Sequence, residues 1–299
     1  MLCGCFSPGP QAESIVYRMV SVVRLRRTAS LLGITAIYFV AVAQALPPSA
    51  PISERDAVSP AALDSRADIP DALAKFPSGP LNQFLRLISS LPQGAAALDA
   101  VGKVLTPLQQ GLADAVGIDT TKDDLAQSTS CADVTVVFAR GTTEPGNVGL
   151  VTGPPFFDAL KEQLGSKSLA VQGVEYPATF AGFNKNGTEG VPSMTAFINQ
   201  ALTTCPETKV VVSGYSQGAL VVRGTAASLP ADTMSRVSSV VTFGDPRNQT
   251  AITGAEGKTL TICHENDAVC SGGFITVDHL TYADNADEAA QFVVGKAQG

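Results

Sequence analysis

The fold of this chain is decided by residues 210–222, which read V-V-V-S-G-Y-S-Q-G-A-L-V-V. The apolar β-branched run predicts a strand, Gly214 and Gly218 predict a sharp turn, and the small and apolar residues that follow predict a helix. A serine between two glycines at such a junction is typical of a nucleophile on a strained turn. We therefore expect Ser216 to be a nucleophile; a glycine-rich turn with a solvated serine is the simpler alternative.

Outward from this stretch, strand-like runs alternate with helical stretches. Strands are predicted at residues 134–138, 169–176, 210–213, 237–243 and 260–263, and helices at residues 154–165, 193–204, directly after Ser216, and 284–296. Continuous β-branched strands separated by helices are typical of a buried parallel sheet. The pattern predicts an α/β fold with three layers around a central five-stranded parallel sheet, and a site at the carboxyl ends of its strands.

The first 45 residues have the features of a secretory signal peptide. Arginines at positions 24, 26 and 27 precede an uncharged apolar run at residues 31–42, and small residues follow at 43–45. The run is shorter than the ~20 residues that a membrane-spanning helix needs, so a signal anchor is the less favoured alternative. We expect cleavage after Ala45, secretion, and no stable membrane insertion. Sequons at Asn186 and Asn248 agree with export and predict glycosylation.

The charge balance excludes one class of partner. After the leader the chain has 16 basic and 26 acidic residues, a net charge of −10. It has no basic block and no interleaving of basic and aromatic residues that would hold a phosphate backbone, so we expect no nucleic-acid partner. The acidic balance predicts a soluble monomer, and no cofactor is expected.

Four cysteines remain once the leader is removed: Cys131, Cys205, Cys263 and Cys270. An even number in an exported chain predicts two disulfides. Three pairings are possible; closeness in the sequence favours Cys263–Cys270, which leaves Cys131–Cys205. Zinc binding by Cys263, His264 and Cys270 is an alternative, but it lacks the ligand spacing of structural zinc sites, and we expect no metal.

The region before the α/β part divides into two segments. Residues 46–80 are rich in Pro, Ala, Ser and Asp without an apolar period, which predicts a disordered linker or propeptide. Residues 81–124 have apolar residues at helical spacing, and we expect Pro92 and Pro107 to break or open these amphipathic helices. The helices are consistent with a packed subdomain, a lid over the site, or a pro-segment removed after export. Residues 125–299 form the predicted catalytic domain.

A nucleophilic serine needs a base within reach and a carboxylate that orients the base. The chain has two histidines, His264 and His279. Because His279 lies downstream of Ser216 and of several acids, it fits the order Ser…Asp…His of α/β-hydrolases, and we favour it. His264 is then an ordinary loop histidine.

Three acids compete to orient His279. We favour Asp267, which lies twelve residues before the histidine inside the predicted Cys263–Cys270 loop, where the disulfide would hold it still. Asp245 also follows a strand but is interpreted as a turn residue that caps the next segment. Asp278 is adjacent to His279 and is expected to point elsewhere.

An oxyanion hole needs N–H donors aimed at the developing charge. One donor is expected from Gln217, the residue after the nucleophile, and another from the loop at residues 139–146 that follows the first strand. In that loop Thr142 offers both an N–H and a hydroxyl, and a simple glycine turn is the alternative.

Apolar residues also lie between the predicted acid and base. If residues 272–277 form a loop, Phe274, Ile275 and Val277 are exposed beside the serine. Such a patch suits an acyl chain or contact with a waxy surface, and inward packing of the three residues is the alternative.

Taken together, four ordered segments resemble the fungal cutinases: residues 131–147, the elbow at 214–218, the Cys263…Asp267…Cys270 loop, and residues 279–282. The resemblance covers about residues 125–299. It implies a lidless α/β-hydrolase with Ser216, Asp267 and His279 as catalytic triad. It also implies an oxyanion hole at Thr142 and Gln217 and the disulfides Cys131–Cys205 and Cys263–Cys270. Many relatives have Ser where this chain has Thr142, and residues 81–117 depart from the short members of the family.

The function that the resemblance implies is a secreted serine esterase that hydrolyses cutin-like polyesters and short-to-medium acyl esters. Its partner would be a polyester or lipid-ester surface. An acetylxylan esterase of the same fold is the alternative within the same chemistry. A non-catalytic secreted surface-binding or elicitor protein is the alternative from another class.

Overall fold

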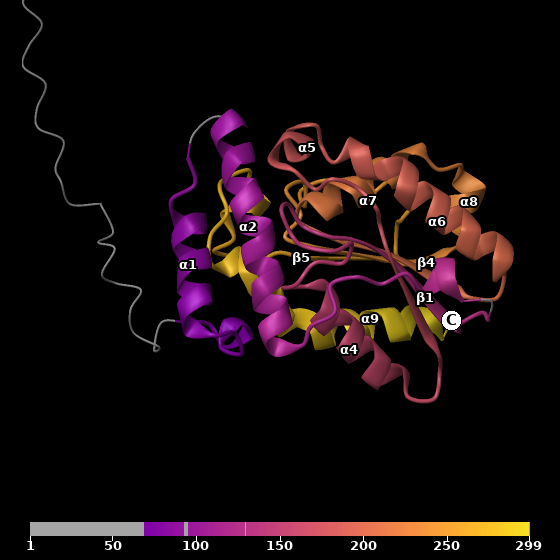
Figure 1. Ribbon diagram of the computed structural model, residues 1–299. Helices are drawn as coiled ribbons and strands as arrows, with labels where there is room; N and C mark the ends of the chain where they lie inside the picture. Colours follow the sequence, from indigo (N-terminus) through magenta and orange to yellow (C-terminus); the bar gives the residue numbers. More distant parts are fainter. Residues whose placement is uncertain (1–68, 93–94, 129, 299) are drawn as a thin grey trace, which may run out of the picture. The chain divides into compact units, whose positions relative to one another are not determined.

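The computed structural model describes residues 69–92, 95–128 and 130–298, all within one compact unit, Val58–Gly299. The predicted leader and residues 46–68 of the predicted linker lie outside the described residues. Within the described part, the architecture is a parallel sheet enclosed by helices and preceded by a helical pair (Figure 1).

The sheet has five parallel strands in the order β2-β1-β3-β4-β5. The strands are β1 (Val134–Ala139), β2 (Leu169–Gly173), β3 (Lys209–Tyr215), β4 (Val237–Phe243) and β5 (Thr259–Ile262). All five predicted strands are present, with ends that differ by a few residues, and the predicted fold class is confirmed. The central strands β1 and β3 carry the loop at residues 141–143 and Ser216 at their carboxyl ends.

Helices cover both faces of the sheet. On one face lie α4 (Gly153–Leu164) and α9 (Ala286–Ala297), and on the other lie α6 (Val191–Thr204) and α7 (Gln217–Ser228) (Figure 1). Successive residues of a strand point to opposite faces, so Val136 and Phe138 pack with α4 and α9, while Val137 and Ala139 pack with α6 and α7. Burial on both faces is the reason that the strands read as continuous apolar runs.

Short helices complete the domain and had no counterpart in the sequence-based expectation. They are the α-helices α3 (Asp124–Gln127), α5 (Phe180–Asn184) and α8 (Ala231–Ser235), and the 3₁₀ helices η3 (Asp71–Leu73), η4 (Thr188–Gly190), η5 (Ala268–Ser271), η6 (Asp278–Leu280) and η7 (Tyr282–Asn285). Elements of three to five residues are too short to show a hydrophobic period.

The helical region consists of α1 (Ser78–Ser89) and α2 (Ala95–Val116). Pro92 lies between them as predicted, but Pro107 lies inside α2 and does not interrupt it, which corrects that expectation. The proline removes the N–H that would bond to the carbonyl of Lys103, and because both residues are exposed, water can reach this carbonyl.

The predicted linker at 46–80 does not extend through residues 69–80. Leu73 and Phe76 are buried in the same apolar cluster as Phe84 and Ile88 of α1. The composition of this segment predicts disorder, but a few apolar residues within it pack against the domain. Elsewhere the predicted disulfides are confirmed: Cys131 is bonded to Cys205, and Cys263 to Cys270.

Candidate active site

Ser216 occupies a strained turn between β3 and α7. Its backbone has φ 56° and ψ −116°, a conformation that residues other than glycine rarely adopt. The turn needs its flanking glycines because a Cβ on Gly214 would lie 2.3 Å from the carbonyl oxygen of Gly218, and a Cβ on Gly218 would lie 1.9 Å from that of Ala139. The N–H of Ser216 donates to the carbonyl of Phe243 at 2.9 Å, which holds the turn against β4.

His279 and Asp267 meet beyond the end of β5. Nδ1 of His279 lies 2.6 Å from Oδ2 of Asp267, and both residues are buried. The N–H of Val269 donates to the other carboxylate oxygen at 2.9 Å. Burial raises the pKa of Asp267, but the hydrogen bonds and the charge of His279 outweigh it, so this pKa lies below its ordinary value.

Tyr282 is a site residue that the sequence did not single out by role. Its hydroxyl donates to Oδ2 of Asp267 at 2.5 Å, and its side chain is fully buried. The only sequence signal was its position three residues after His279, which by itself does not reveal a contact with an acid twelve residues before that histidine.

His279 and Ser216 line one cavity. Among the described residues, Nε2 of His279 is buried and has no hydrogen-bond partner. The cavity that His279 lines with Ser216 and Tyr215 has a volume of about 20 Å³. The Tyr215 hydroxyl donates to the carbonyl of His279 at 2.7 Å, and the two rings lie 5.0 Å apart, which further fixes the imidazole.

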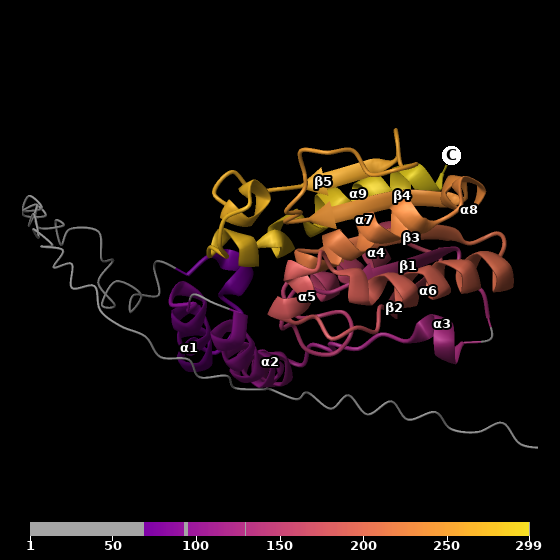
Figure 2. The same cartoon turned by 90° about the horizontal axis from the view of Figure 1, so that it is seen from above.

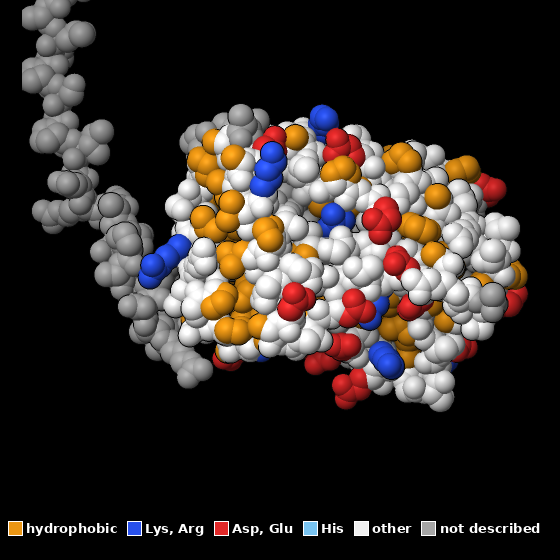
Figure 3. Space-filling view, viewed as in Figure 1, with side chains coloured by type: hydrophobic (Ala, Val, Ile, Leu, Met, Phe, Trp, Pro, Cys, Tyr) orange, Lys and Arg blue, Asp and Glu red, His pale blue; other side chains and the backbone are white. Residues whose placement is uncertain are grey.

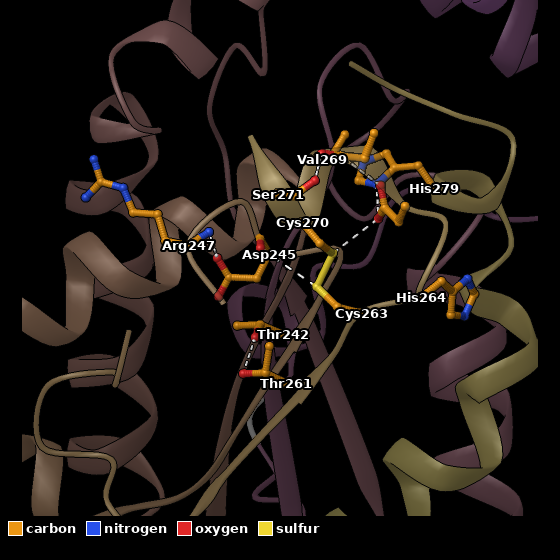
Figure 4. Close-up of a disulfide and its surroundings, with 12 residues drawn as sticks. Thr242, Asp245, Arg247, Thr261, Cys263, His264, Val269, Cys270, Ser271 and His279 are labelled. Carbon is orange, nitrogen blue, oxygen red and sulfur yellow. Dashed lines mark hydrogen bonds and ion pairs between the residues drawn. A yellow bond between two sulfur atoms is a disulfide. The ribbon is translucent and has the colours of Figure 1, made fainter. Parts of the chain in front are cut away.

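The competing candidates have other partners, and Figure 4 shows Asp245 beside Arg247. Asp245 is buried and accepts from Nε of Arg223 at 3.0 and 2.8 Å and from the N–H of Arg247 at 2.9 Å, so it acts as an ion-pair and turn residue. His264 lies with Nδ1 3.0 Å from the carbonyl of Asp278 and Nε2 2.6 Å from Oδ1 of Asn285. Because Cys263 and Cys270 are bonded to each other, they are not available as a pair of thiolate zinc ligands.

The predicted oxyanion residues lie next to each other. The amide of Gln217 satisfies all its neighbours when its nitrogen donates to Oγ1 of Thr142 at 3.0 Å and to the carbonyl of Thr179 at 3.1 Å, while its oxygen accepts from Phe183 N–H at 2.8 Å. In this orientation the Thr142 hydroxyl accepts from Gln217, which leaves its own proton for another acceptor.

Glu144 anchors the loop that contains Thr142. Its buried carboxylate accepts from the N–H groups of Gly141, Leu150 and Val151 at 2.7, 2.9 and 3.0 Å. Burial raises the pKa of Glu144, against the opposing effect of these three donors. The sequence expectation treated Glu144 as one loop residue among others.

The site is covered, which corrects the lidless site that the resemblance implied. Phe84 and Ile88 of α1 line the cavity that contains Ser216 and His279, and Ser216 is only 4% exposed. Figure 2 shows α1 and α2 beside the loops that follow the strands. The apolar residues of these helices belong to the same buried cluster as the core of the domain.

A second cavity of about 200 Å³ adjoins Ser216. Its lining is mainly apolar and includes Leu98 of α2, Phe183 of α5, and Phe274 and Ile275 of the loop after η5. The expected exposure of this loop is correct for Phe274, which is 67% exposed. Ile275 and Val277 are instead half-buried and pack against the core.

The rest of the described chain offers neither a metal cluster nor a membrane span. No group of three His, Cys, Asp or Glu side chains suited to a metal occurs in the described ranges. Within the same ranges, no helix combines the length and apolar character needed to cross a bilayer.

A parallel α/β sheet with a serine on a sharp strand-to-helix turn, a histidine and a buried carboxylate defines the class of α/β-hydrolases. Residues 130–297 match the Cutinase family model. The chain is 45% identical over 202 residues to cutinase pbc1 of Pyrenopeziza brassicae, and this match covers 67% of the chain and 98% of the relative. It is 42% identical over 216 residues to a cutinase of Hypocrea jecorina, and this match covers 72% of the chain and 85% of the relative.

Solved structures agree with these matches. The Trichoderma reesei cutinase in complex with a C11Y4 phosphonate inhibitor superposes with a TM-score of 0.64 at 43% identity, and the match covers 73% of this chain and 98% of that one. The chain therefore belongs to the cutinase family and is a carboxylic ester hydrolase.

Proposed function

We propose that this protein hydrolyses esters through an acyl-enzyme formed on Ser216. Nε2 of His279 takes the proton of the serine hydroxyl as Oγ attacks the ester carbonyl. The N–H of Gln217, with the N–H and hydroxyl of Thr142, stabilises the resulting oxyanion. His279 then gives its proton to the leaving alcohol, and a water activated by the same histidine releases the acid.

The observation that carries this proposal is the arrangement of His279. Its Nδ1 is held 2.6 Å from Asp267, while its Nε2 has no partner among the described residues, and the His279 residue lines one cavity with Ser216. A bond from Nδ1–H to a carboxylate selects the tautomer whose Nε2 can accept a proton.

The proposed substrates are cutin-like polyesters and short-to-medium acyl esters. The apolar lining near Ser216, with Leu98, Phe183 and Phe274, suits an acyl chain better than a bare acetyl group. This supports the polyester over acetylxylan as the substrate. A non-catalytic binding protein would need neither the strained serine nor the buried His279–Asp267 pair.

We further propose that α1 and α2 stay attached and act as a lid. The T. reesei match covers about 218 residues of this chain, more than the 170 from residue 130 to the end, so it reaches into the helical region. This supports a retained segment over a removed pro-segment. Hydrophobic side chains are spread over the face of α1 and α2 that Figure 3 shows. Val104 of α2 is 50% exposed. An apolar substrate surface can contact such a face.

The proposed setting is extracellular. It rests on the leader features, the two disulfides and the secretion expected of this family. Asn186, the first sequon, is exposed at the end of α5, and Asn248 is half-buried. A monomer bearing N-glycans at these positions is proposed.

Chain-length profiling tests the substrate class. We expect p-nitrophenyl esters of four to eight carbons to be hydrolysed faster than the acetate, and Ser216→Ala to abolish both hydrolysis and labelling by a fluorophosphonate probe. Activity confined to acetyl esters would favour the acetylxylan esterase, and an unlabelled wild-type serine would favour the binding protein.

The lid is tested by the physical state of the substrate. The hydrolysis rate should rise steeply once an ester exceeds its solubility and forms droplets. Phe84→Ala should raise the rate on dissolved ester, because it removes a side chain that covers Ser216. Arg86→Ala, an exposed change on the same helix, should match wild type. Equal rates on dissolved and dispersed ester in all three proteins would argue against a lid.

A further inference from the structure

The loop residue next to Thr142 has a strained backbone. Thr143 has φ 64°, in the left-handed region that favours glycine, and its side chain is buried. A non-glycine residue keeps such a conformation only where its surroundings hold it. The N–H of Thr143 donates to the carbonyl of Ala178 at 2.7 Å, which holds one of its two peptide groups.

The other peptide group of Thr143 is held by α2. Its carbonyl accepts from Oγ1 of Thr106 at 2.8 Å and from Nε2 of Gln109 at 3.0 Å, and Nε2 of Gln109 also lies 3.3 Å from Oγ1 of Thr143. Gln109 is 3% exposed, so its bonds to Thr143 are shielded from water, while the bond from Thr106 is partly buried. The helix approaches closely, since a Cβ on Gly102 would lie 3.3 Å from the Thr143 methyl group.

The two helices of the lid are attached in different ways. α2 is joined to the catalytic domain by hydrogen bonds from Thr106 and Gln109. A second connection runs through Thr120, whose hydroxyl donates to Oε1 of Gln110 at 3.1 Å. The carbonyl of Thr120 in turn accepts from the N–H groups of Asn147 and Val148. Among the described residues, no hydrogen bond joins α1 to the catalytic domain, and its contacts there are apolar.

We infer that Gln109 and Thr106 are positioning residues for the oxyanion hole, so that α2 also supports the catalytic loop. The inference rests on the proposed role of Thr142. Thr142 lies between Gly141, whose N–H is held by Glu144, and Thr143, whose N–H and carbonyl are both held. Fixing both neighbours sets the direction of the Thr142 N–H, and an oxyanion donor works only when it is preorganised.

The experiment compares variants of α2 on p-nitrophenyl butyrate kept below its solubility limit. Gln109→Leu and Thr106→Val preserve side-chain volume and remove the donors to Thr143. We expect each to lower kcat about tenfold and the double variant about a hundredfold, with KM changed less than twofold, since removing an oxyanion donor itself costs ~10²–10³ in kcat. In these variants, Ser216 should also react with a phosphonate more slowly by a similar factor, because the P–O group of the phosphonate binds the same oxyanion-hole donors.

Two matched variants separate positioning from stability. Gln110→Leu, a change on the same helix, loses the bonds to Thr120 and Asp114 but none to Thr143, and should keep kcat within twofold of wild type. Thr106→Ser retains the hydroxyl and should restore the kcat that Thr106→Val loses, even if Gln109→Leu fails to fold. Equal kcat for Gln109→Leu, Thr106→Val and Gln110→Leu, or a loss confined to KM, would overturn the inference and leave the proposed esterase intact. A wild-type protein without Ser216-dependent hydrolysis would overturn both.

Discussion

The hydroxyl of Tyr282 and Nδ1 of His279 converge on the same oxygen of Asp267, at 2.5 and 2.6 Å. The carboxylate thus shares its negative charge between the histidine that it orients and a tyrosine that is fully buried. The ring of Tyr282 also stacks on His264 with centroids 4.2 Å apart, so the hydroxyl is fixed by packing. The tyrosine and the imidazole therefore share one carboxylate oxygen.

Tyr282→Phe should slow the reaction without weakening substrate binding. The change keeps the ring stack and removes the hydroxyl, with its hydrogen bond to Asp267 and the bond that it accepts from the N–H of His264 at 3.2 Å. We expect kcat to fall about tenfold, equivalent to ~1.4 kcal/mol in the barrier, with KM unchanged. The acid limb of the kcat/KM profile should move to higher pH, because the Tyr282 hydroxyl is one of the groups that lower the pKa of Asp267. A drop in thermal stability with an unmoved pH profile would mean that the hydroxyl acts only in folding.

Substitution of Asp267 should mainly affect catalysis, and substitution of Asp245 should mainly affect stability. Asp267→Asn removes the charge that orients His279 and should lower kcat by about 10⁴. Asp245→Asn weakens the buried pair with Arg223 and should destabilise the fold by roughly 3 kcal/mol, while kcat of the folded protein stays within a fewfold of wild type. Steady-state kinetics and urea unfolding of both variants check this. A damaging Asp245→Asn beside a mild Asp267→Asn would assign the orienting role to Asp245.

Asp267 should also contribute to acid sensitivity. Its pKa in the folded protein lies below the ordinary 3.8 because His279, Tyr282 and the N–H of Val269 outweigh burial. A depressed carboxyl pKa gives stability that is present above the ordinary value and lost as pH falls through the folded one. The free energy of unfolding of wild type should therefore decline below about pH 4 more steeply than that of Asp267→Asn. Parallel curves in urea titrations at several pH values would contradict this.

We expect the Cys131–Cys205 bond to matter more for stability and the Cys263–Cys270 bond to matter more for activity. In the chain-entropy model, losing Cys131–Cys205, which closes a separation of 74 residues, costs about 4.5 kcal/mol, and losing Cys263–Cys270, with a separation of 7, costs about 2.5 kcal/mol. Because Asp267 lies inside the smaller loop, we expect the Cys263→Ser, Cys270→Ser variant to lose more kcat. Unfolding and kinetics of both double variants measure the difference, and a larger kcat loss from opening Cys131–Cys205 would contradict it.

Much of the site was predictable because its signals are local or few. The turn at Ser216 is predictable because it requires glycine on both sides, where a Cβ has no room. The catalytic base is predictable because the chain has only two histidines. The small Cys263–Cys270 loop pointed to Asp267 over Asp245. Only the structure gives the partners of these two acids, since both follow strands whose carboxyl ends lie at one edge of the sheet.

The amino-acid sequence by itself determined the parallel sheet, the serine elbow and the order of the catalytic candidates, because strand, turn and helix preferences act over a few residues. Only the tertiary structure decided that α1 covers Ser216, that Gln109 of α2 reaches Thr143, and that Tyr282 shares the carboxylate of Asp267. These relationships join residues whose separation in the sequence says nothing of their distance in space. An amphipathic helix specifies that one face will be buried, and the shape of the folded domain selects the surface on which it packs.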